Sequence, residues 1–94
     1  MRTLVTEVVN GESYCYQPLG KYVVRAVGVC GERPTFKYTR IEITGVLERL
    51  AAGENIDTIV QGFRGRVCKE AIAEAGWIVT NQFLESLPTL EPAA

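Results

Sequence analysis

The densest charge in the sequence is a short basic stretch. Between Thr58 and Lys69 the chain carries Arg64, Arg66 and Lys69 and no acidic residue. Beyond Lys69 the balance reverses, because the only charged residues that follow are acidic: Glu70, Glu74, Glu85 and Glu91. Guanidinium and ammonium groups are the side chains that bind phosphates. Arg64, Arg66 and Lys69 are therefore predicted to contact the phosphates of DNA.

A second basic group lies in the segment GERPTFKYTRIEI, residues 31–43. Arg33 and Lys37 are interpreted as solvated surface charges that could also touch nucleic acid. Arg40 has two interpretations, since its planar donor fork suits both a phosphate or partner carboxylate and the carbonyl groups of nearby loop ends. We favour the carbonyl clamp and keep Arg40 among the candidate DNA contacts.

Catalysis and metal binding are poorly supported by the residue types present. The sequence contains no histidine, so no imidazole base is available. Its cysteines Cys15, Cys30 and Cys68 are widely spaced and form no CxxC pair. We expect three small buried thiols, no metal, no cofactor and no enzymatic activity.

The bulk properties favour one small domain. The chain has 94 residues, 47% of them hydrophobic, a net charge of −1 and a pI near 5.4. This balance argues against a strongly basic nucleic-acid-binding protein but leaves local basic patches possible. The first residues lack the apolar core of a signal peptide, and no apolar run approaches the roughly 20 residues of a membrane span. We expect a cytoplasmic protein that does not contact membranes.

The N-terminal third is predicted to be extended. Asn10-Gly11 is a strong signal for a two-residue hairpin, which would place Glu7 opposite Tyr14 and Val5 opposite Tyr16. A third strand is expected over residues 22–27. Because both faces of this ribbon are mixed, Tyr14 and Tyr16 are predicted to be exposed aromatics that form a homodimer interface.

The rest of the chain is predicted to be helical, which makes the fold class α+β. The first helix is expected to start at an N-cap, Thr44, and to end at Gly53, with Leu50 buried where the helices meet. Asn55 is expected to cap a second helix that ends at Gly62. The third helix is expected over about residues 68–87, with an apolar face at helical spacing: Ala71, Ile72, Ala75, Val79 and Phe83.

These elements divide the chain into a ribbon (residues 1–28), a helix-turn-helix-like unit (29–88) and a frayed tail (89–94). In a helix-turn-helix the third helix enters the major groove with its N-terminal end nearest the bases, where the basic stretch lies. A plain three-helix bundle would show the same apolar stripes. Four aromatic residues are interpreted as core or dimer-interface anchors: Tyr14, Tyr16, Phe63 and Trp77.

The stretch GERPTFKYTRIEITGVLERLAAGENIDTIV resembles the bacterial and archaeal family named domain of unknown function 433. Members carry G-x-P-x-x-x-G-T-R-I, then L-L-A-A-G at the end of a helix. This sequence matches at Gly31 (one residue further from the proline than in the pattern), Pro34, Thr39, Arg40 and Ile41, and again at residues 50–53. It departs at Tyr38, where the family usually has Gly, and at Cys68, where the third-helix cap is usually Thr.

The resemblance implies a helix-turn-helix class and a predicted antitoxin role, often beside a PIN-like nuclease toxin. The leading hypothesis is thus a homodimeric antitoxin-type DNA-binding transcriptional regulator. The alternative is a protein-interaction module with a helix-turn-helix-like fold that no longer binds DNA. The acidic pI, together with Glu70 and Glu74 on the supposed recognition helix, favours the alternative.

Overall fold

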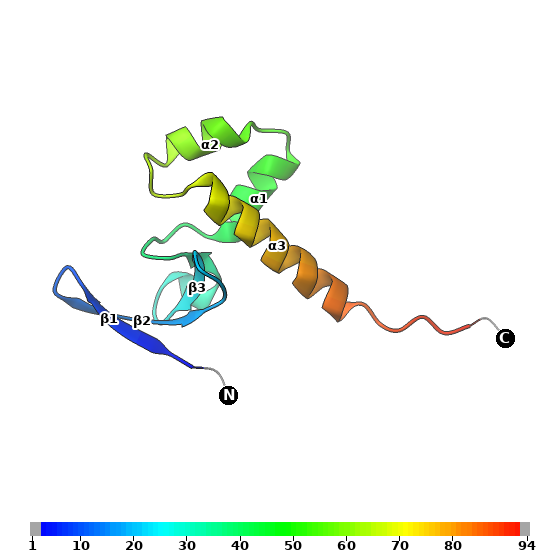
Figure 1. Cartoon of the computed structure of the whole chain (residues 1–94), viewed down its shortest axis with the longest axis horizontal. Helices are drawn as coiled ribbons and strands as arrows, with labels where there is room; N and C mark the ends of the chain where they lie inside the picture. The colour runs from blue at the N-terminus through cyan, green and yellow to red at the C-terminus, as the bar shows by residue number, and fades with distance from the viewer. Residues whose placement is uncertain (1–2, 93–94) are drawn as a thin grey trace.

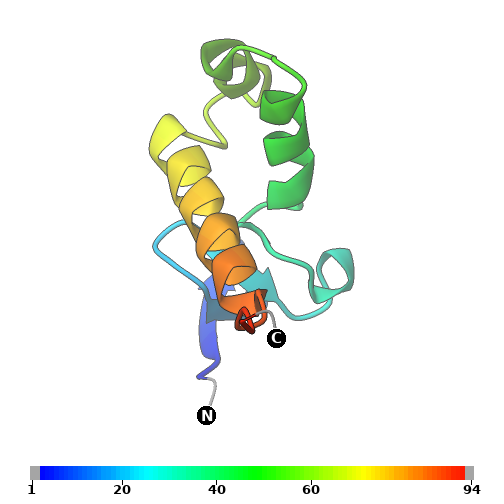
Figure 2. The ribbon, with the colours of Figure 1, turned by 90° about the vertical axis from the view of Figure 1, so that its right-hand side faces the viewer.

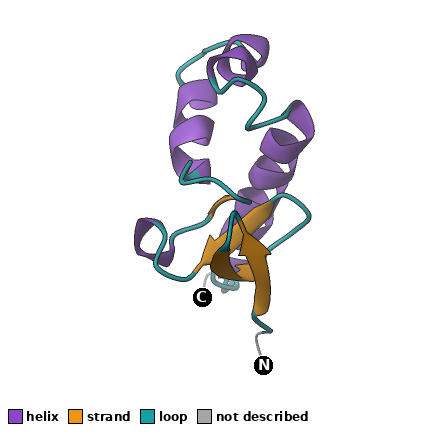
Figure 3. Cartoon of the chain, turned by 90° about the vertical axis from the view of Figure 1, so that its left-hand side faces the viewer, coloured by secondary structure: helices purple, strands orange, loops and turns teal. Residues whose placement is uncertain are grey.

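The computed structural model describes residues 3–92 and shows a small antiparallel sheet followed by three helices (Figure 1). The predicted α+β class is confirmed. The elements in chain order are β1 (Val5–Val9), β2 (Glu12–Pro18), β3 (Val23–Ala26), the 3₁₀ turn η1 (Cys30–Glu32), β4 (Thr35–Phe36), α1 (Ile43–Ala51), α2 (Ile56–Gly62) and α3 (Lys69–Ser86). In Figure 3 the strands lie together at one end of the molecule, and the helices extend from there to the other end.

The four strands form one antiparallel sheet in the order β1-β2-β3-β4. Asn10 and Gly11 adopt φ values of 52° and 80°, as the predicted hairpin turn requires. The predicted pairing of Val5 with Tyr16 and of Glu7 with Tyr14 is confirmed. β4 was not predicted, because a two-residue strand leaves no periodic pattern in the sequence.

Helix α1 begins without the predicted Thr44 cap, so that prediction is wrong. Its N-cap residue is Glu42, whose side chain makes no capping hydrogen bond, and Thr44 lies exposed inside the helix. The backbone of the incoming strand replaces the cap, since the Ile43 N–H donates to the Pro34 carbonyl at 3.2 Å. This hydrogen bond satisfies one of the free backbone N–H groups at the helix start. The helix can therefore begin one residue before Thr44, without a cap from the Thr44 hydroxyl.

The other helix ends follow the sequence signals. Gly53 follows α1 with φ of 96°, and Asn55 Oδ1 accepts hydrogen bonds from the N–H groups of Asp57 and Thr58. Helix α2 ends at Gly62 as expected. Cys68 is the N-cap of α3 and makes no capping hydrogen bond, as expected for a thiol at this position.

The main core lies between β3, β4 and the three helices. Its buried residues are Val23, Phe36, Ile43, Val46, Ile59, Val67, Ala71, Ile72 and Ala75. Leu50 is only half-buried at its edge, contrary to the expectation that it lies at the centre. The predicted inner face of α3 is also wrong in its second half, because Val79 and Phe83 are 40% and 60% exposed.

Glu74 ties α3 to the sheet. Its carboxylate accepts hydrogen bonds from the backbone N–H groups of Lys21, Tyr22 and Val23, at 2.7–3.1 Å. Carboxylates bound by several amides are held firmly, since each of these hydrogen bonds is charge-assisted. Glu74 therefore fixes the β2–β3 loop against the helix and does not project toward solvent as a recognition-helix acid would.

A second, smaller core lies within the sheet and consists of Tyr16, Val24 and Ala26. Tyr16 is only 4% exposed, and Tyr14 packs beside it with ring centroids 5.1 Å apart. The premise that both tyrosines are exposed is therefore wrong, because Tyr16 is buried and Tyr14 is half-buried beside it. Whether these residues touch a second chain stays a prediction.

The three cysteines are free thiols, as expected, but each is half-buried and none is fully enclosed. Within residues 3–92, no helix is both long and apolar enough to cross a bilayer.

Candidate nucleic-acid interface

The turn at residues 36–41 positions the candidate basic residues. Thr39 is buried, its hydroxyl donates to the Phe36 carbonyl at 2.8 Å, and the same oxygen accepts from the Ile41 N–H at 3.0 Å. The Phe36 N–H closes the turn by donating to the Ile41 carbonyl. A small hydroxyl residue is needed here because it must donate and accept inside the fold.

Tyr38, at the tip of this turn, has a left-handed backbone with φ of 67°. This conformation favours glycine, the residue that the family resemblance leads us to expect at this position. Two hydrogen bonds hold the tyrosine there: its N–H donates to the Tyr14 hydroxyl at 2.9 Å, and its own hydroxyl donates to Glu7 at 2.8 Å. Residues of the hairpin thus hold Tyr38 in its strained conformation. The sequence alone showed only that Tyr38 departs from the family pattern.

We expect the backbone strain at Tyr38 to be measurable by comparing two truncations. Tyr38→Ala and Tyr38→Gly both lose the ring and its hydrogen bonds, but only alanine keeps a Cβ in the left-handed region. The glycine variant should be more stable by about 1 kcal/mol in urea unfolding. An alanine variant equal to or more stable than the glycine variant would show that the turn is not left-handed.

Lys37 lies inside a cluster of aromatic rings and does not extend into solvent. Its ammonium is 3.6 Å from the Glu7 carboxylate and about 5 Å from the ring centroids of Tyr16 and Tyr38. Glu7 in turn accepts hydrogen bonds from both tyrosine hydroxyls. The interpretation of Lys37 as a solvated surface charge is therefore wrong, because Glu7 neutralises it and the rings cover its stem.

The cluster shifts three titrations. Hydrogen bonds from Tyr16 and then Tyr38 lower the pKa of Glu7 below its ordinary 4.5, and Lys37 adds to this effect. Interaction with the Tyr16 hydroxyl raises the pKa of Lys37, and the hydrogen bond to Glu7 raises the pKa of Tyr38. All three shifts favour an ionised Glu7, an ionised Lys37 and a neutral Tyr38 at neutral pH. Glu7 and Lys37 therefore form a stable ion pair under those conditions.

Because the folded-state pKa of Glu7 is lowered, its contribution to stability is present above pH 4.5 and is lost as the pH falls through the lower folded-state value. Glu7→Gln should therefore be less stable than the wild type at neutral pH, and the difference should shrink in acid. Thermal melts from neutral pH to about pH 3 measure this convergence. Glu48→Gln, on the exposed side of α1, is the control; a Glu7→Gln deficit that is constant with pH would contradict the assignment.

Two shallow hollows, of 450 and 480 Å³, meet at Tyr38 and Arg66, which line both. Lys21 and Lys37 line the first hollow, and no acidic residue lines it. Arg40 lines the second, with Glu12 as its one acidic lining residue. Basic side chains from the β2–β3 loop, the 36–41 turn and the α2–α3 turn thus converge around one exposed tyrosine. We call Lys21, Tyr38, Arg40 and Arg66 the basic patch.

The six predicted DNA-contact residues differ in the structure, because some are paired with carboxylates and others are not. Arg40 and Arg66 belong to the basic patch, and Lys37 lies beside it but is paired with Glu7. Arg33 is bound bidentately by Glu42 at 2.7 and 3.2 Å, and Lys69 is 2.7 Å from Asp57.

Arg64 is exposed in the α2–α3 turn with φ of 53° and has no ion pair within the described chain. The favoured interpretation of Arg40 is wrong, because over residues 3–92 its guanidinium makes no hydrogen bond and only its carbonyl is used, by Cys30 Sγ at 3.3 Å. Arg40 is therefore exposed and available to a ligand.

Sequence reasoning missed Lys21. It reaches the patch because the Lys37 N–H donates to the Tyr22 carbonyl at 2.7 Å, which places the β2–β3 loop beside the 36–41 turn. Glu74 fixes the same loop from the other side. No local signal in the sequence marks Lys21, since its position depends on contacts with residues 16 and 53 positions later.

With this geometry established, the family can be stated. The model of the family described as Protein of unknown function (DUF433) matches residues 23–76, more than half of the chain, and the chain belongs to this family. The matched segment starts at β3 and ends within α3, so Tyr38, Arg40 and Arg66 fall inside it and Lys21 falls outside. No curated protein and no solved structure matches the chain significantly.

Proposed function

We propose that this chain is an antitoxin-type DNA-binding transcriptional regulator that contacts DNA phosphates through its basic patch. The observation that carries the proposal is the convergence of Lys21, Arg40 and Arg66 around exposed Tyr38. Other cations, such as Arg33, Arg49 and Lys69, are engaged by carboxylates. Within the described chain Arg40 and Arg66 have no ion pair, whereas Lys21 lies close enough to Glu70 to interact with its charge. Cations gathered on an overall acidic chain are what local phosphate binding requires.

The proposed contact differs from the one that a helix-turn-helix outline suggests. Arg66 lies in the turn that leads into α3, and Arg40 and Lys21 come from the sheet side. DNA would therefore lie across the junction of the sheet and the α2–α3 turn, with Arg64 beside it. Phosphate contacts of this kind position a protein on DNA without reading its sequence.

The regulatory part of the proposal rests on the family resemblance. An antitoxin of this type would bind a PIN-like nuclease toxin through a surface other than the basic patch and act as a homodimer in the cytoplasm.

The test is a gel shift against the protein's own upstream DNA at several salt concentrations. We expect binding that weakens steeply as salt rises, with a preference for the upstream fragment over an unrelated fragment of equal length. Salt-dependent binding without a preference for the upstream fragment would support phosphate binding by the basic patch and would contradict the role as a transcriptional regulator. Absence of any salt-dependent binding would reject both.

The alternative is a protein-interaction module that does not bind DNA, and Glu70 specifically favours it. A hydrogen bond with its own backbone amide lowers the pKa of Glu70. Its carboxylate thus occupies the N-terminal end of α3, where a phosphate would otherwise meet the amides. If Glu70→Gln creates or strengthens DNA binding, the acidic helix start acts against DNA in the native protein.

A further inference from the structure

The second half of α3 has an apolar face that nothing in the described chain covers. The stripe that packs on α1 in the first half of the helix continues past the start of α1, and there it faces solvent. Gly76 still lies close to Leu47 of α1, but Phe83, two turns later, is 60% exposed. Figures 1 and 2 show this part of α3 extending beyond α1 and α2 toward the C-terminus.

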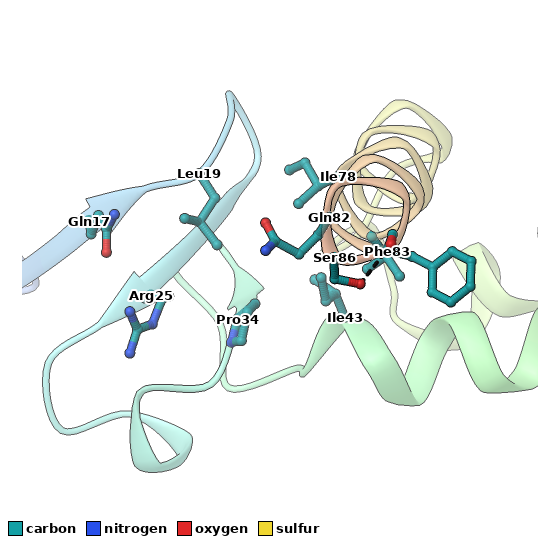
Figure 4. Close-up of a pocket in the computed structure, with 10 residues that line it drawn as sticks. Gln17, Leu19, Arg25, Pro34, Ile43, Ile78, Gln82, Phe83 and Ser86 are labelled. Carbon is teal, nitrogen blue, oxygen red and sulfur yellow. Dashed lines mark hydrogen bonds between the residues drawn. The ribbon is translucent and has the colours of Figure 1, made fainter. Parts of the chain in front are cut away.

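The face consists of four apolar side chains, which we call the distal face: Trp77, Phe83, Leu84 and Leu87, exposed by 69, 60, 56 and 50%. In Figure 4 the ring of Phe83 points to the opposite side of α3 from Leu19 and Gln17. The groove between α3 and the sheet, of 520 Å³, adjoins the distal face through Phe83, which lines it together with Val79.

We propose that the distal face is the interface of a homodimer, with α3 of one chain packed antiparallel on α3 of a second copy. The four side chains leave roughly 500 Å² of apolar surface exposed on each chain, so a symmetric pair buries on the order of 1,000 Å², the lower limit for a specific interface. A patch of this size lies within the range of the largest apolar patch that a monomer carries, and such a patch often marks an interaction site.

The absence of charge on this face explains why a second copy fits it. In a two-fold contact the same surface of both copies meets, so a face that carried charges of one sign would repel its own copy. Glu85 follows Phe83 by two residues and lies on the other side of the helix, and Glu74 is turned to the β2–β3 loop. Antiparallel packing about an axis between Phe83 and Leu84 places Phe83 of one chain opposite Leu84 of the other.

The experiment is light scattering of the full chain over a range of micromolar concentrations, with circular dichroism as the check on folding. The wild type should give twice the 10.4 kDa chain mass. Phe83→Asp should keep the helical spectrum and raise the dimer dissociation constant by a factor on the order of 100, as loss of a central aromatic anchor does. Leu84→Asp should act in the same direction.

The matched control is Val8→Asp, which places the same charge on an apolar ribbon residue that is 77% exposed. It should leave the dimer mass unchanged. A monomeric wild type over the whole range, or a dimer that survives Phe83→Asp, would overturn the proposal. A dimer lost in Val8→Asp alone would move the interface to the ribbon that carries Tyr14. None of these outcomes depends on DNA binding.

Discussion

Phe36→Ala is expected to lower the free energy of unfolding by about 3–5 kcal/mol, the range for truncating a buried phenylalanine. Phe36 is 2% exposed and is among the largest fully buried side chains of the main core. It joins β4 to the helices, and its carbonyl and N–H both bond within the 36–41 turn. A domain of this size has about 5–14 kcal/mol of stability in total, so the variant should be close to unfolding at 37 °C.

Leu50→Ala is the matched comparison. Because Leu50 is half-buried at the edge of the core, its truncation should cost less than about 2 kcal/mol. Urea unfolding of the two variants measures both values. Equal losses, or a larger loss for Leu50, would show that α1 packs with a different face toward the sheet.

The second large effect concerns the basic patch. Arg40→Ala combined with Arg66→Ala should weaken binding to all DNA sequences alike. It should reduce the slope of log affinity against log salt by about 2, because each phosphate contact contributes about 0.9. Both side chains are exposed and make no hydrogen bond in the described chain, so the fold should change by no more than about 0.5 kcal/mol.

The control for this pair removes the same charge from paired positions. Arg33→Ala combined with Arg49→Ala deletes two arginines that Glu42 and Glu54 already neutralise. Its salt slope should match that of the wild type. If both double variants lose the same slope, DNA responds to net charge and the basic patch has no special role.

Most of the fold could be predicted because its signals are local. Asn10-Gly11, Gly53 and Asn55 each determine a turn or a helix end through their own backbone preferences, and all three behave as expected. The prediction that Thr44 caps α1 was wrong because a carbonyl distant in the sequence, that of Pro34, accepts a hydrogen bond from the helix start. The inner face of α3 was predicted too long because periodicity shows an apolar stripe but not where its partner, α1, begins.

The candidate site was less predictable, because it forms from residues far apart in the sequence. The sequence shows a run of three equivalent bases: Arg64, Arg66 and Lys69. In the structure Lys69 is paired with Asp57, whereas Arg66 lines the same 480 Å³ hollow as Arg40. The hairpin places Glu7 against Lys37, which no spacing rule could indicate over 30 positions. Charge pairing decides which bases remain available, and it depends on the tertiary fold.

The most direct test of the nucleic-acid interface is to map it by NMR. A ¹⁵N-labelled chain would be titrated with a short duplex at low salt, and the amide shifts compared with those after high salt is restored. We predict salt-reversible shifts at Lys21, Tyr38, Arg40 and Arg64–Arg66, with residues 77–87 unaffected. Unchanged spectra, or shifts confined to α3 beyond Trp77, would contradict DNA binding at the basic patch.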